Sequence, residues 1–243
     1  MRKARSYAEV YNDLDDDVVN LFRIIRSDRA GELVHALRNT PFSRTEFSDA
    51  YEYADDEVER ARRLIIRSFM GFGSGGSNRD KKTGFRANSN RSGTTHAHDW
   101  TNYPDAMAAL IERIKGVVIE NRDARDVMTQ HDGPDTLHYI DPPYLPETRS
   151  KSAQNIRGQC NVYRHELTID DHAELLSSIT QLTGMVVLSG YPSPLYDEAL
   201  SGWTRVDRRA LADGARQRTE VLWINPRASE KISTPSLFAG VSA

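Results

Sequence analysis

Short apolar segments alternate with amphipathic helical patterns along this chain, and no other feature of the sequence constrains the fold as strongly. The predicted strands are residues 8–11, 116–120, 137–140, 185–189 and 220–224. The predicted helices are residues 16–25, 32–38, 44–69, 103–114 and 167–182, the first of them capped by Asp16. Strands that alternate with helices favour an α/β fold with a doubly wound, mostly parallel sheet covered on both faces. A length of 243 residues accommodates one such domain together with an insertion.

The composition excludes several classes of protein. With 38% hydrophobic and 28% charged residues, the chain is too apolar for a disordered protein and too polar for a membrane protein. Its one cysteine, Cys160, leaves no partner for an internal disulfide and no zinc site built from cysteines. The sequence shows neither a signal-peptide pattern nor a long apolar run. We therefore expect a cytoplasmic protein that does not bind a membrane.

Charge is segregated along the chain, although the formal net charge is only -3. Residues 60–91 hold nine basic side chains and one acid, Asp80, whereas residues 9–17 hold five acids and no base. Residues 71–98 are rich in glycine, serine, asparagine and threonine, which predicts a loop or an insertion. Such a basic segment binds a polyanion, or it is a solvated surface loop.

Three acids follow predicted strands, and in doubly wound sheets ligands bind beyond the carboxyl ends of the strands. These acids are Asp13, Asp123 and Asp141. The third begins the tetrapeptide Asp141-Pro142-Pro143-Tyr144, which comes directly after an apolar strand. A structural alternative stays open for each, because an aspartate also caps helices and forms turns, and the tetrapeptide also suits a rigid strand exit.

The tetrapeptide suits alkylation of an amino group attached to an aromatic heterocycle. Such a nitrogen is a poor nucleophile because its lone pair is delocalised into the ring. The Asp141 carboxylate and the Pro142 carbonyl can both accept hydrogen bonds from the amine and turn its lone pair toward an electrophile. The fixed φ angles of Pro142 and Pro143 hold this carbonyl in place. Tyr144 offers a flat face on which an extruded base stacks.

Together these motifs resemble the Dam-like family of DNA adenine-N6 methyltransferases, especially its prophage-associated members. The tetrapeptide carries the resemblance, which extends over nearly the whole chain. The supporting segments are residues 11–15, 18–22, 67–69, 119–123, 163–166, 188–191 and 218–223. The resemblance implies transfer of a methyl group from S-adenosylmethionine, without a metal ion, to N6 of an adenine flipped out of double-stranded DNA.

The resemblance also implies roles for individual residues. The catalytic residues are Asp141, Pro142, Pro143 and Tyr144. Asp13 matches the acid that binds the ribose of S-adenosylmethionine, and Asp123 matches the acid beside its adenine. Residues 60–98 fall where the family places its target-recognition region. The DNA contacts expected in that region are Arg67, Lys81, Lys82, Arg86 and Arg91.

The sequence departs from the family pattern at its amino terminus. It contains neither the Gly-Gly-Lys motif nor the Phe-x-Gly-Gly type loop that wraps the methionine part of the cofactor. In the family's sheet the strand before that loop lies between the second strand and the strand that precedes Asp141. We therefore expect an N-terminally truncated methyltransferase, or one part of a split enzyme completed by a separately encoded segment, that binds the cofactor weakly alone. The alternatives are an inactive DNA-binding remnant and a cytosine-N4 methyltransferase.

The predicted organisation is a catalytic core of residues 1–30 and 111–226, a helical and loop-rich target-recognition insertion of residues 31–110, and a C-terminal tail of residues 227–243. The glycines of residues 71–76 follow a helical segment rather than a strand, which argues against a dinucleotide site. His165 and Glu166 do not form a zinc motif, since Ile169 stands where a second histidine is needed. We therefore expect no metal site.

Overall fold

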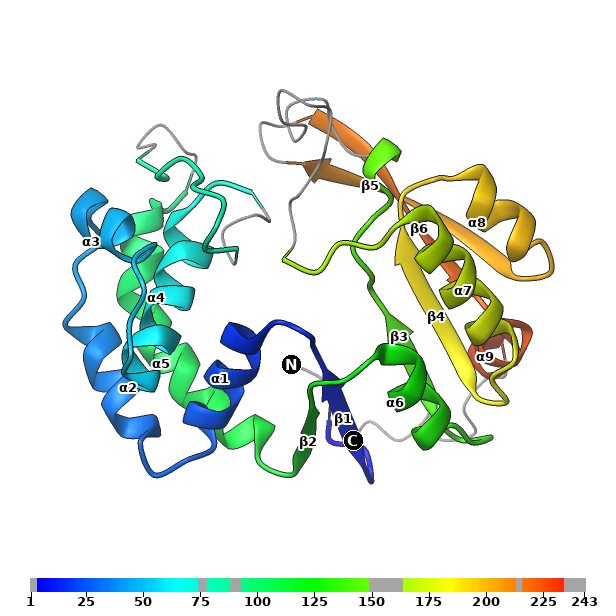
Figure 1. Cartoon of the computed structure of the whole chain (residues 1–243), viewed down its shortest axis with the longest axis horizontal. Coiled ribbons are helices and arrows are strands. Elements are labelled where there is room, and N and C mark those ends of the chain that lie inside the picture. Colours follow the sequence, from blue (N-terminus) through cyan, green and yellow to red (C-terminus); the bar gives the residue numbers. More distant parts are fainter. Residues whose placement is uncertain (1–3, 74–77, 88–92, 149–163, 213–215, 234–243) are drawn as a thin grey trace, which may run out of the picture. The chain divides into compact units, whose positions relative to one another are not determined.

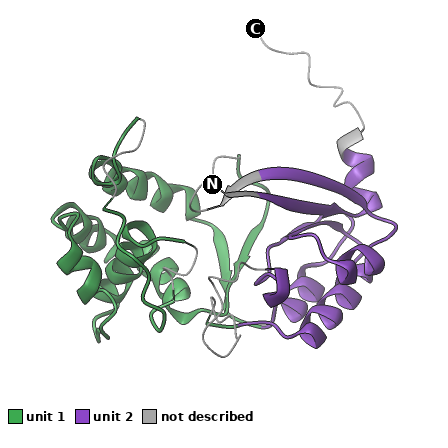
Figure 2. Ribbon diagram, turned by 90° about the horizontal axis from the view of Figure 1, so that it is seen from above, with its two compact units in different colours: residues 1–122, 162–165 green, residues 123–161, 166–243 purple. Residues whose placement is uncertain are grey.

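The computed structural model describes residues 4–73, 78–87, 93–148, 164–212 and 216–233. The chain divides into two compact units, which are coloured separately in Figure 2. Unit 1 comprises residues 1–122 and 162–165, and unit 2 comprises residues 123–161 and 166–243. Both units combine helices with strands, so the α/β class predicted from the sequence is confirmed.

The described residues of unit 1 contain a two-stranded parallel sheet. β1 (Glu9–Asn12) pairs with β2 (Val117–Glu120). β1 leads into α1 (Asp16–Ile25), whose N-terminal amides are capped by the carboxylate of Asp15. The cap is one residue earlier than expected, because Asp15 has the extended backbone that a capping residue adopts, whereas Asp16 is already helical.

Helices make up most of unit 1 (Figure 1). The remaining described helices of this unit are α2 (Ala30–Arg38), α3 (Arg44–Asp49), α4 (Glu57–Met70) and α5 (His96–Ile114). Their apolar side chains pack with those of α1 in one core, in which Leu33, Ile66 and Ile114 are fully buried. Each side chain of this size contributes roughly 1.5–3 kcal/mol when it is removed from water.

The described strands of unit 2 form one mixed sheet in the order β3-β4-β6-β5. Their bounds are β3 (Leu137–Ile140), β4 (Met185–Gly190), β5 (Thr204–Ala212) and β6 (Arg216–Ile224). β3 and β4 are parallel, whereas β6 is antiparallel to both β4 and β5. Among the described strands, the pairs β1–β2 and β3–β4 are parallel, as expected for a mostly parallel sheet. The pairs β4–β6 and β5–β6 are antiparallel, which was not expected.

The helices of unit 2 pack on its sheet. The described elements are α6 (Ala124–His131), the 3-10 turn η2 (Pro146–Thr148), α7 (Ile169–Thr180), α8 (Pro194–Ala199) and α9 (Pro226–Ser233). Leu176 of α7 and Tyr196 of α8 share a core with Leu188 and Trp223 of the sheet, on the face where Figure 1 shows these helices. No helix in the described ranges is long and apolar enough to cross a membrane.

Most predicted elements are confirmed at their centres, and one helix start needs correction. The mainly helical segment predicted over residues 44–69 contains two helices, because the chain leaves the helical conformation after α3 and Asp56 caps a new one. The helix expected from residue 103 begins at His96, where Thr95 supplies the cap. Pro104 lies inside this helix rather than at its start.

The tail predicted over residues 227–243 is wrong for residues 227–233, which belong to α9 (Pro226–Ser233). Asn225 begins this helix, since its side-chain oxygen accepts a hydrogen bond from the Ala228 amide at 2.9 Å. Ala228 is 3% exposed and so belongs to the buried part of unit 2. Residues 234–243 lie outside the described ranges. The compact units also group the predicted insertion, residues 31–110, with β1, α1 and β2, so the predicted domain bounds stay a prediction.

Candidate active site

The carboxyl ends of β3 and β4 bring Asp141 and Ser189 together. In the parallel register Ile140 lies opposite Leu188, so the residues that follow are neighbours. The Ser189 hydroxyl lies 2.7 Å from Oδ1 of Asp141 and 3.2 Å from the carbonyl oxygen of Ile140. A hydroxyl has one proton to donate, and the shorter contact, to a charged acceptor, is the stronger. Ser189, which is 6% exposed, therefore fixes the Asp141 carboxylate while Asp141 itself remains exposed.

Two prolines stiffen the chain directly after this carboxylate. Pro142 is buried and Pro143 is half-buried, and Leu145 is 3% exposed in the core of unit 2. Within the described ranges, no hydrogen bond reaches the carbonyl oxygen of Pro142. Prolines have fixed φ angles and no N–H, so this carbonyl is held in place and retains its capacity to accept a hydrogen bond from a ligand.

Tyr144 forms an aromatic wall with Tyr191, which follows β4. The two rings meet edge to face, with centroids 4.6 Å apart and planes 72° apart. Arg218 of β6 supports Tyr191, because its Nη1 donates to the Tyr191 hydroxyl at 3.0 Å and its guanidinium lies 5.3 Å from the centre of the ring. Burial raises the pKa of Tyr144, and the carboxylates of Asp141 and Glu220 raise it further. Tyr144 is therefore a neutral, half-buried ring beside Asp141.

Asp13 and Asp123, the acids assigned to the cofactor, belong to different units, and each completes a local turn. Oδ1 of Asp13 accepts a hydrogen bond from the Asp15 amide at 2.9 Å, and Oδ2 accepts one from the Tyr11 hydroxyl at 3.0 Å. Asp123 caps α6 and accepts bonds from the backbone and side chain of Arg125 at 2.8 and 2.7 Å. These bonds from Arg125 lower the pKa of Asp123. The structural alternative stated for these aspartates is therefore observed, because Asp13 forms a turn and Asp123 caps a helix.

The two acids differ in how much hydrogen-bonding capacity remains. A carboxylate has about four lone-pair sites. The contacts of Asp13 leave it able to accept bonds from ribose hydroxyls. Asp123 also accepts from Nε of Arg125 at 3.0 Å, so most of its acceptor capacity is taken by one arginine. Asp13 thus fits a hydroxyl-bearing ligand as it stands, and Asp123 fits a ligand only if Arg125 gives up some of these bonds.

The residues expected to bind DNA differ in accessibility. Arg67 is 2% exposed, and its guanidinium donates to the carbonyl of Ala50 at 2.6 Å and pairs with Asp17 at 3.3 Å. A side chain in this position does not reach a phosphate, so the expected DNA contact of Arg67 is corrected to a structural role. Lys82 is exposed, and Lys81 and Arg86 are half-buried. Arg91 lies outside the described residues.

The sequence matches the profile of the D12 class N6 adenine-specific DNA methyltransferases over residues 1–179. This match covers most of the chain and includes Asp141 and the three residues after it. The chain belongs to this family. The predicted resemblance to Dam-like adenine methyltransferases is thereby confirmed, and membership supports an enzyme that methylates adenine in DNA. A search of curated proteins found no match to this methyltransferase.

Two residues of the candidate site, Ser189 and Tyr191, were predicted only as part of the supporting segment of residues 188–191. Ser189 fixes Asp141, and Tyr191 forms the wall beside Tyr144. The sequence feature that could have identified both residues is the polar segment Ser189-Gly190-Tyr191 at the end of an apolar strand. Its meaning depends on the register of β3 against β4, which the sequence does not reveal. In the described parts of this methyltransferase, no group of three histidine, cysteine, aspartate or glutamate side chains is placed to hold a metal ion.

Proposed function

We propose that this methyltransferase uses S-adenosylmethionine to methylate N6 of an adenine that is flipped out of duplex DNA. The observation that carries the proposal is the exposed carboxylate of Asp141, oriented by Ser189 and followed by the proline-held carbonyl of Pro142. Two fixed acceptors at one strand end suit an aromatic amine, because such a group offers two N–H donors and needs its lone pair turned out of the ring plane.

The proposed chemistry depends on orientation more than on proton removal. Asp141 and the Pro142 carbonyl each accept one hydrogen bond from the adenine amino group, so the nitrogen becomes pyramidal and its lone pair points away from the ring. When bound, S-adenosylmethionine supplies a methyl carbon activated by a positively charged sulfur. As the new N–C bond formed, the bond between the methyl carbon and the sulfur would break and leave a neutral thioether. The nitrogen would then carry the positive charge, and Asp141, which accepts one of its N–H bonds, would take up the proton that it loses. Holding the amine in one orientation lowers the entropic part of the barrier.

The proposed base pocket uses the aromatic wall. A flipped adenine stacks on the ring of Tyr144, and Tyr191 limits how far that ring turns. Stacking of one base on an aromatic side chain is worth roughly 1–3 kcal/mol, which offsets part of the cost of removing the base from the duplex. The half-buried, neutral phenol of Tyr144 suits this role because it adds no charge to the pocket.

The two proposed cofactor contacts, Asp13 and Asp123, differ in how much of each carboxylate is available to accept hydrogen bonds. Asp13 would bind the ribose hydroxyls of S-adenosylmethionine with its remaining lone pairs. Asp123 would contact the adenine of the cofactor only after Arg125 released part of its carboxylate. The phosphates of the DNA would be bound by Lys81, Lys82, Arg86 and Arg91.

A methyl-transfer assay with the full chain tests this function. Labelled S-adenosylmethionine and unmethylated duplex DNA should yield methylated adenine, and Asp141→Ala should abolish transfer while leaving DNA affinity largely intact. Asp135→Ala is the matched control, since this aspartate is 94% exposed on the same unit and pairs only loosely with Lys231, at 3.9 Å. An Asp141→Ala variant with a near-normal rate would remove Asp141 from the mechanism. Identification of N4-methylcytosine in the digested product would replace adenine by cytosine as the target.

A split enzyme is the second proposal. Within the described residues, β1 and β3 each pair along one edge only, and a further strand could pair with such an edge. In that case the chain would bind S-adenosylmethionine weakly alone and gain transfer activity when another polypeptide supplies the strand. Titration of the purified chain with the cofactor tests this, and micromolar binding without a partner would refute it. A chain that binds DNA with strong salt dependence yet never transfers methyl groups would favour an inactive DNA-binding remnant.

A further inference from the structure

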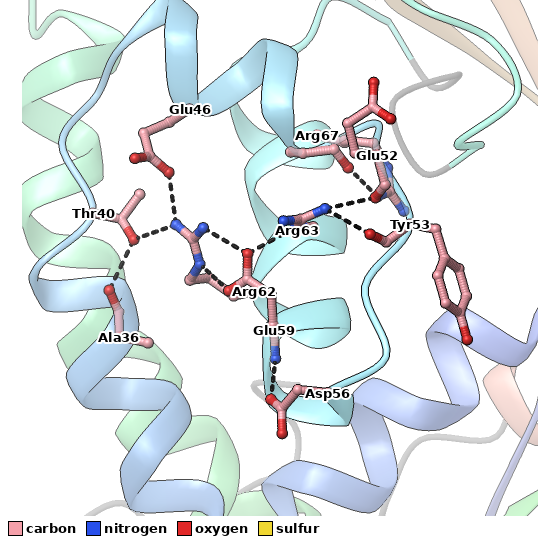
Figure 3. Close-up of polar contacts among 11 residues, drawn as sticks. Ala36, Thr40, Glu46, Glu52, Tyr53, Asp56, Glu59, Arg62, Arg63 and Arg67 are labelled. Carbon is pink, nitrogen blue, oxygen red and sulfur yellow. Dashed lines mark hydrogen bonds and ion pairs between the residues drawn. The ribbon is translucent and has the colours of Figure 1, made fainter.

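Two classes of basic side chain can be distinguished in unit 1, and the first class is neutralised by carboxylates. Figure 3 shows Arg62 of α4 between Glu59 and Glu46, with nitrogen-to-oxygen distances of 2.6 and 2.8 Å. Arg63 shares Glu59 at 2.7 Å. Burial alone would raise the pKa of Glu59, but the bonds from both arginines outweigh it and lower the pKa. The charges of these arginines are therefore balanced inside the unit.

The second class stands over aromatic rings instead of beside carboxylates. The four pairs are Arg44 over Phe85 at 5.0 Å, Arg79 over Tyr53 at 5.4 Å, Lys82 over Tyr51 at 5.7 Å and Arg86 over Phe72 at 6.0 Å. No ion pair joins any of these four cations to a carboxylate within the described ranges. An aromatic face attracts a cation without neutralising it. We call these four side chains the stacked cations.

Two of the four rings, Phe72 and Phe85, lie where two short stretches of backbone are joined by hydrogen bonds. The Phe72 amide donates to the Gly84 carbonyl and the Arg86 amide donates to the Met70 carbonyl, each at 2.8 Å. Phe85 then packs against Phe42, with ring centres 5.1 Å apart. Phe72 and Phe85 are thus held by backbone bonds and by ring packing, and Tyr51 is held by the Thr83 amide, which donates to its hydroxyl at 3.1 Å.

Aromatic stacking leaves the polar edge of a cation available. An arginine has five N–H donors in its plane, and contact with a ring uses the face of the guanidinium rather than those donors. Arg44 and Lys82 are exposed, and Arg79 and Arg86 are half-buried. A cation that is already held in one place loses less conformational entropy when it binds a phosphate. Uncompensated charge, free donors and restricted motion together suit the phosphates of a nucleic-acid backbone.

We propose that the stacked cations form the phosphate-binding surface of unit 1, with Arg44 and Arg79 as contacts, and that the carboxylate-paired arginines of α4 serve only the fold. The partner is duplex DNA, a choice that rests on the proposed function. The surface therefore includes Arg44 on α3, which lies before the basic segment of residues 60–91, and leaves out most of the arginines on α4.

The test is the salt dependence of duplex DNA binding by the full chain. Each lost phosphate contact should reduce the slope of log affinity against log salt by about 0.9 and weaken binding about fivefold near 0.15 M salt. Arg44→Gln and Arg79→Gln together should therefore reduce the slope by about two. The control is Arg38→Gln, which removes an exposed arginine that is paired with Asp105 at 2.8 Å and should leave the slope unchanged.

Two further measurements show whether a reduced slope comes from a lost phosphate contact. Arg44→Lys keeps the charge and should retain the wild-type slope, and thermal unfolding of each variant shows whether the variant is still folded. Equal slopes for the wild type and the folded double glutamine variant would overturn the proposal, whatever the methyl-transfer assay gives. A chain that shows the expected slopes but transfers no methyl group would overturn the proposed function alone.

Discussion

The hydroxyl of Ser189 lies 2.7 Å from the carboxylate of Asp141, at the paired ends of two parallel strands. A buried hydroxyl that donates to an exposed carboxylate sets the direction of that carboxylate. This relationship makes Ser189 a positioning residue for the proposed reaction, since it acts through Asp141 rather than on the substrate.

We expect Ser189→Ala to lower kcat by roughly 10- to 150-fold, because a hydrogen bond to a charged group is worth about 1.5–3 kcal/mol. KM for DNA should change little, since the phosphate contacts lie elsewhere. Ser189→Thr keeps the hydroxyl and should restore most of the rate. Steady-state kinetics of both variants would check this, and an unchanged kcat for Ser189→Ala would show that Asp141 needs no such support.

Two substitutions of Tyr144 should distinguish the contribution of its ring to base extrusion from the contribution of its hydroxyl. Tyr144→Phe keeps the stacking face and should retain base extrusion, whereas Tyr144→Ala should weaken extrusion roughly 5- to 150-fold, which corresponds to 1–3 kcal/mol of stacking. Fluorescence of 2-aminopurine at the target position reports on the extruded base. If both variants extrude the base as the wild type does, Tyr144 is not the stacking surface.

Arg67→Met should destabilise unit 1 by roughly 3 kcal/mol, because it leaves the carboxylate of Asp17 and the carbonyl of Ala50 without their charged donor. The same change at Arg38, whose pair with Asp105 is exposed, should cost less than about 1 kcal/mol. Thermal or urea unfolding measures the difference. Normal stability of Arg67→Met together with a weaker salt dependence of DNA binding would restore Arg67 as a DNA contact.

Asp132 should make unit 2 sensitive to acid. Burial alone would raise the pKa of Asp132, but hydrogen bonds from Thr183, His138 and Gly184 outweigh it and lower the pKa from 3.8 to about 2. A carboxyl whose pKa is lower in the folded state contributes stability above its unfolded pKa and loses it as the pH falls through the folded value. On the order of 2 kcal/mol should therefore disappear between about pH 4 and pH 2.

The control for Asp132 is the exposed Asp135 in the same loop. Asp132→Asn should be less stable at neutral pH and should lack this part of the acid dependence, whereas Asp135→Asn should follow the wild type. Chemical unfolding at a series of pH values gives both curves. Parallel curves for the wild type and Asp132→Asn would assign the acid sensitivity to other groups.

The sequence predicted the elements whose local signals are strong. The strand of residues 137–140 and the helix of residues 16–25 were both predicted at their observed bounds, because an apolar run before two prolines and an apolar stripe after acidic residues are distinctive. β5 escaped prediction because its first half, Thr204–Arg209, alternates with charged residues as a solvated hairpin strand does. α6 escaped because it is short and polar, and only its cap, Asp123, was singled out.

The candidate site was predicted as far as single segments allow. Asp141 and Tyr144 were named from their own tetrapeptide, whereas Ser189 and Tyr191 come from a strand 48 residues further along the chain from Asp141. Arg67 was predicted to be a surface charge because sequence alone does not show which side of α4 faces Asp17 and Ala50. The roles of Ser189 and Arg67 both depend on contacts with residues that are distant in the sequence, which single segments do not reveal.

Asn225 has a consequence for anyone who engineers this chain. Its side chain accepts from the Val186 amide at 3.0 Å and donates to the Gly184 carbonyl at 2.9 Å, while also beginning α9. The start of β4 is thereby joined to the end of β6 by one amide group. A fusion partner inserted at Asn225 would break these hydrogen bonds between β4 and the end of β6. The same partner inserted after Ser233 would leave them intact.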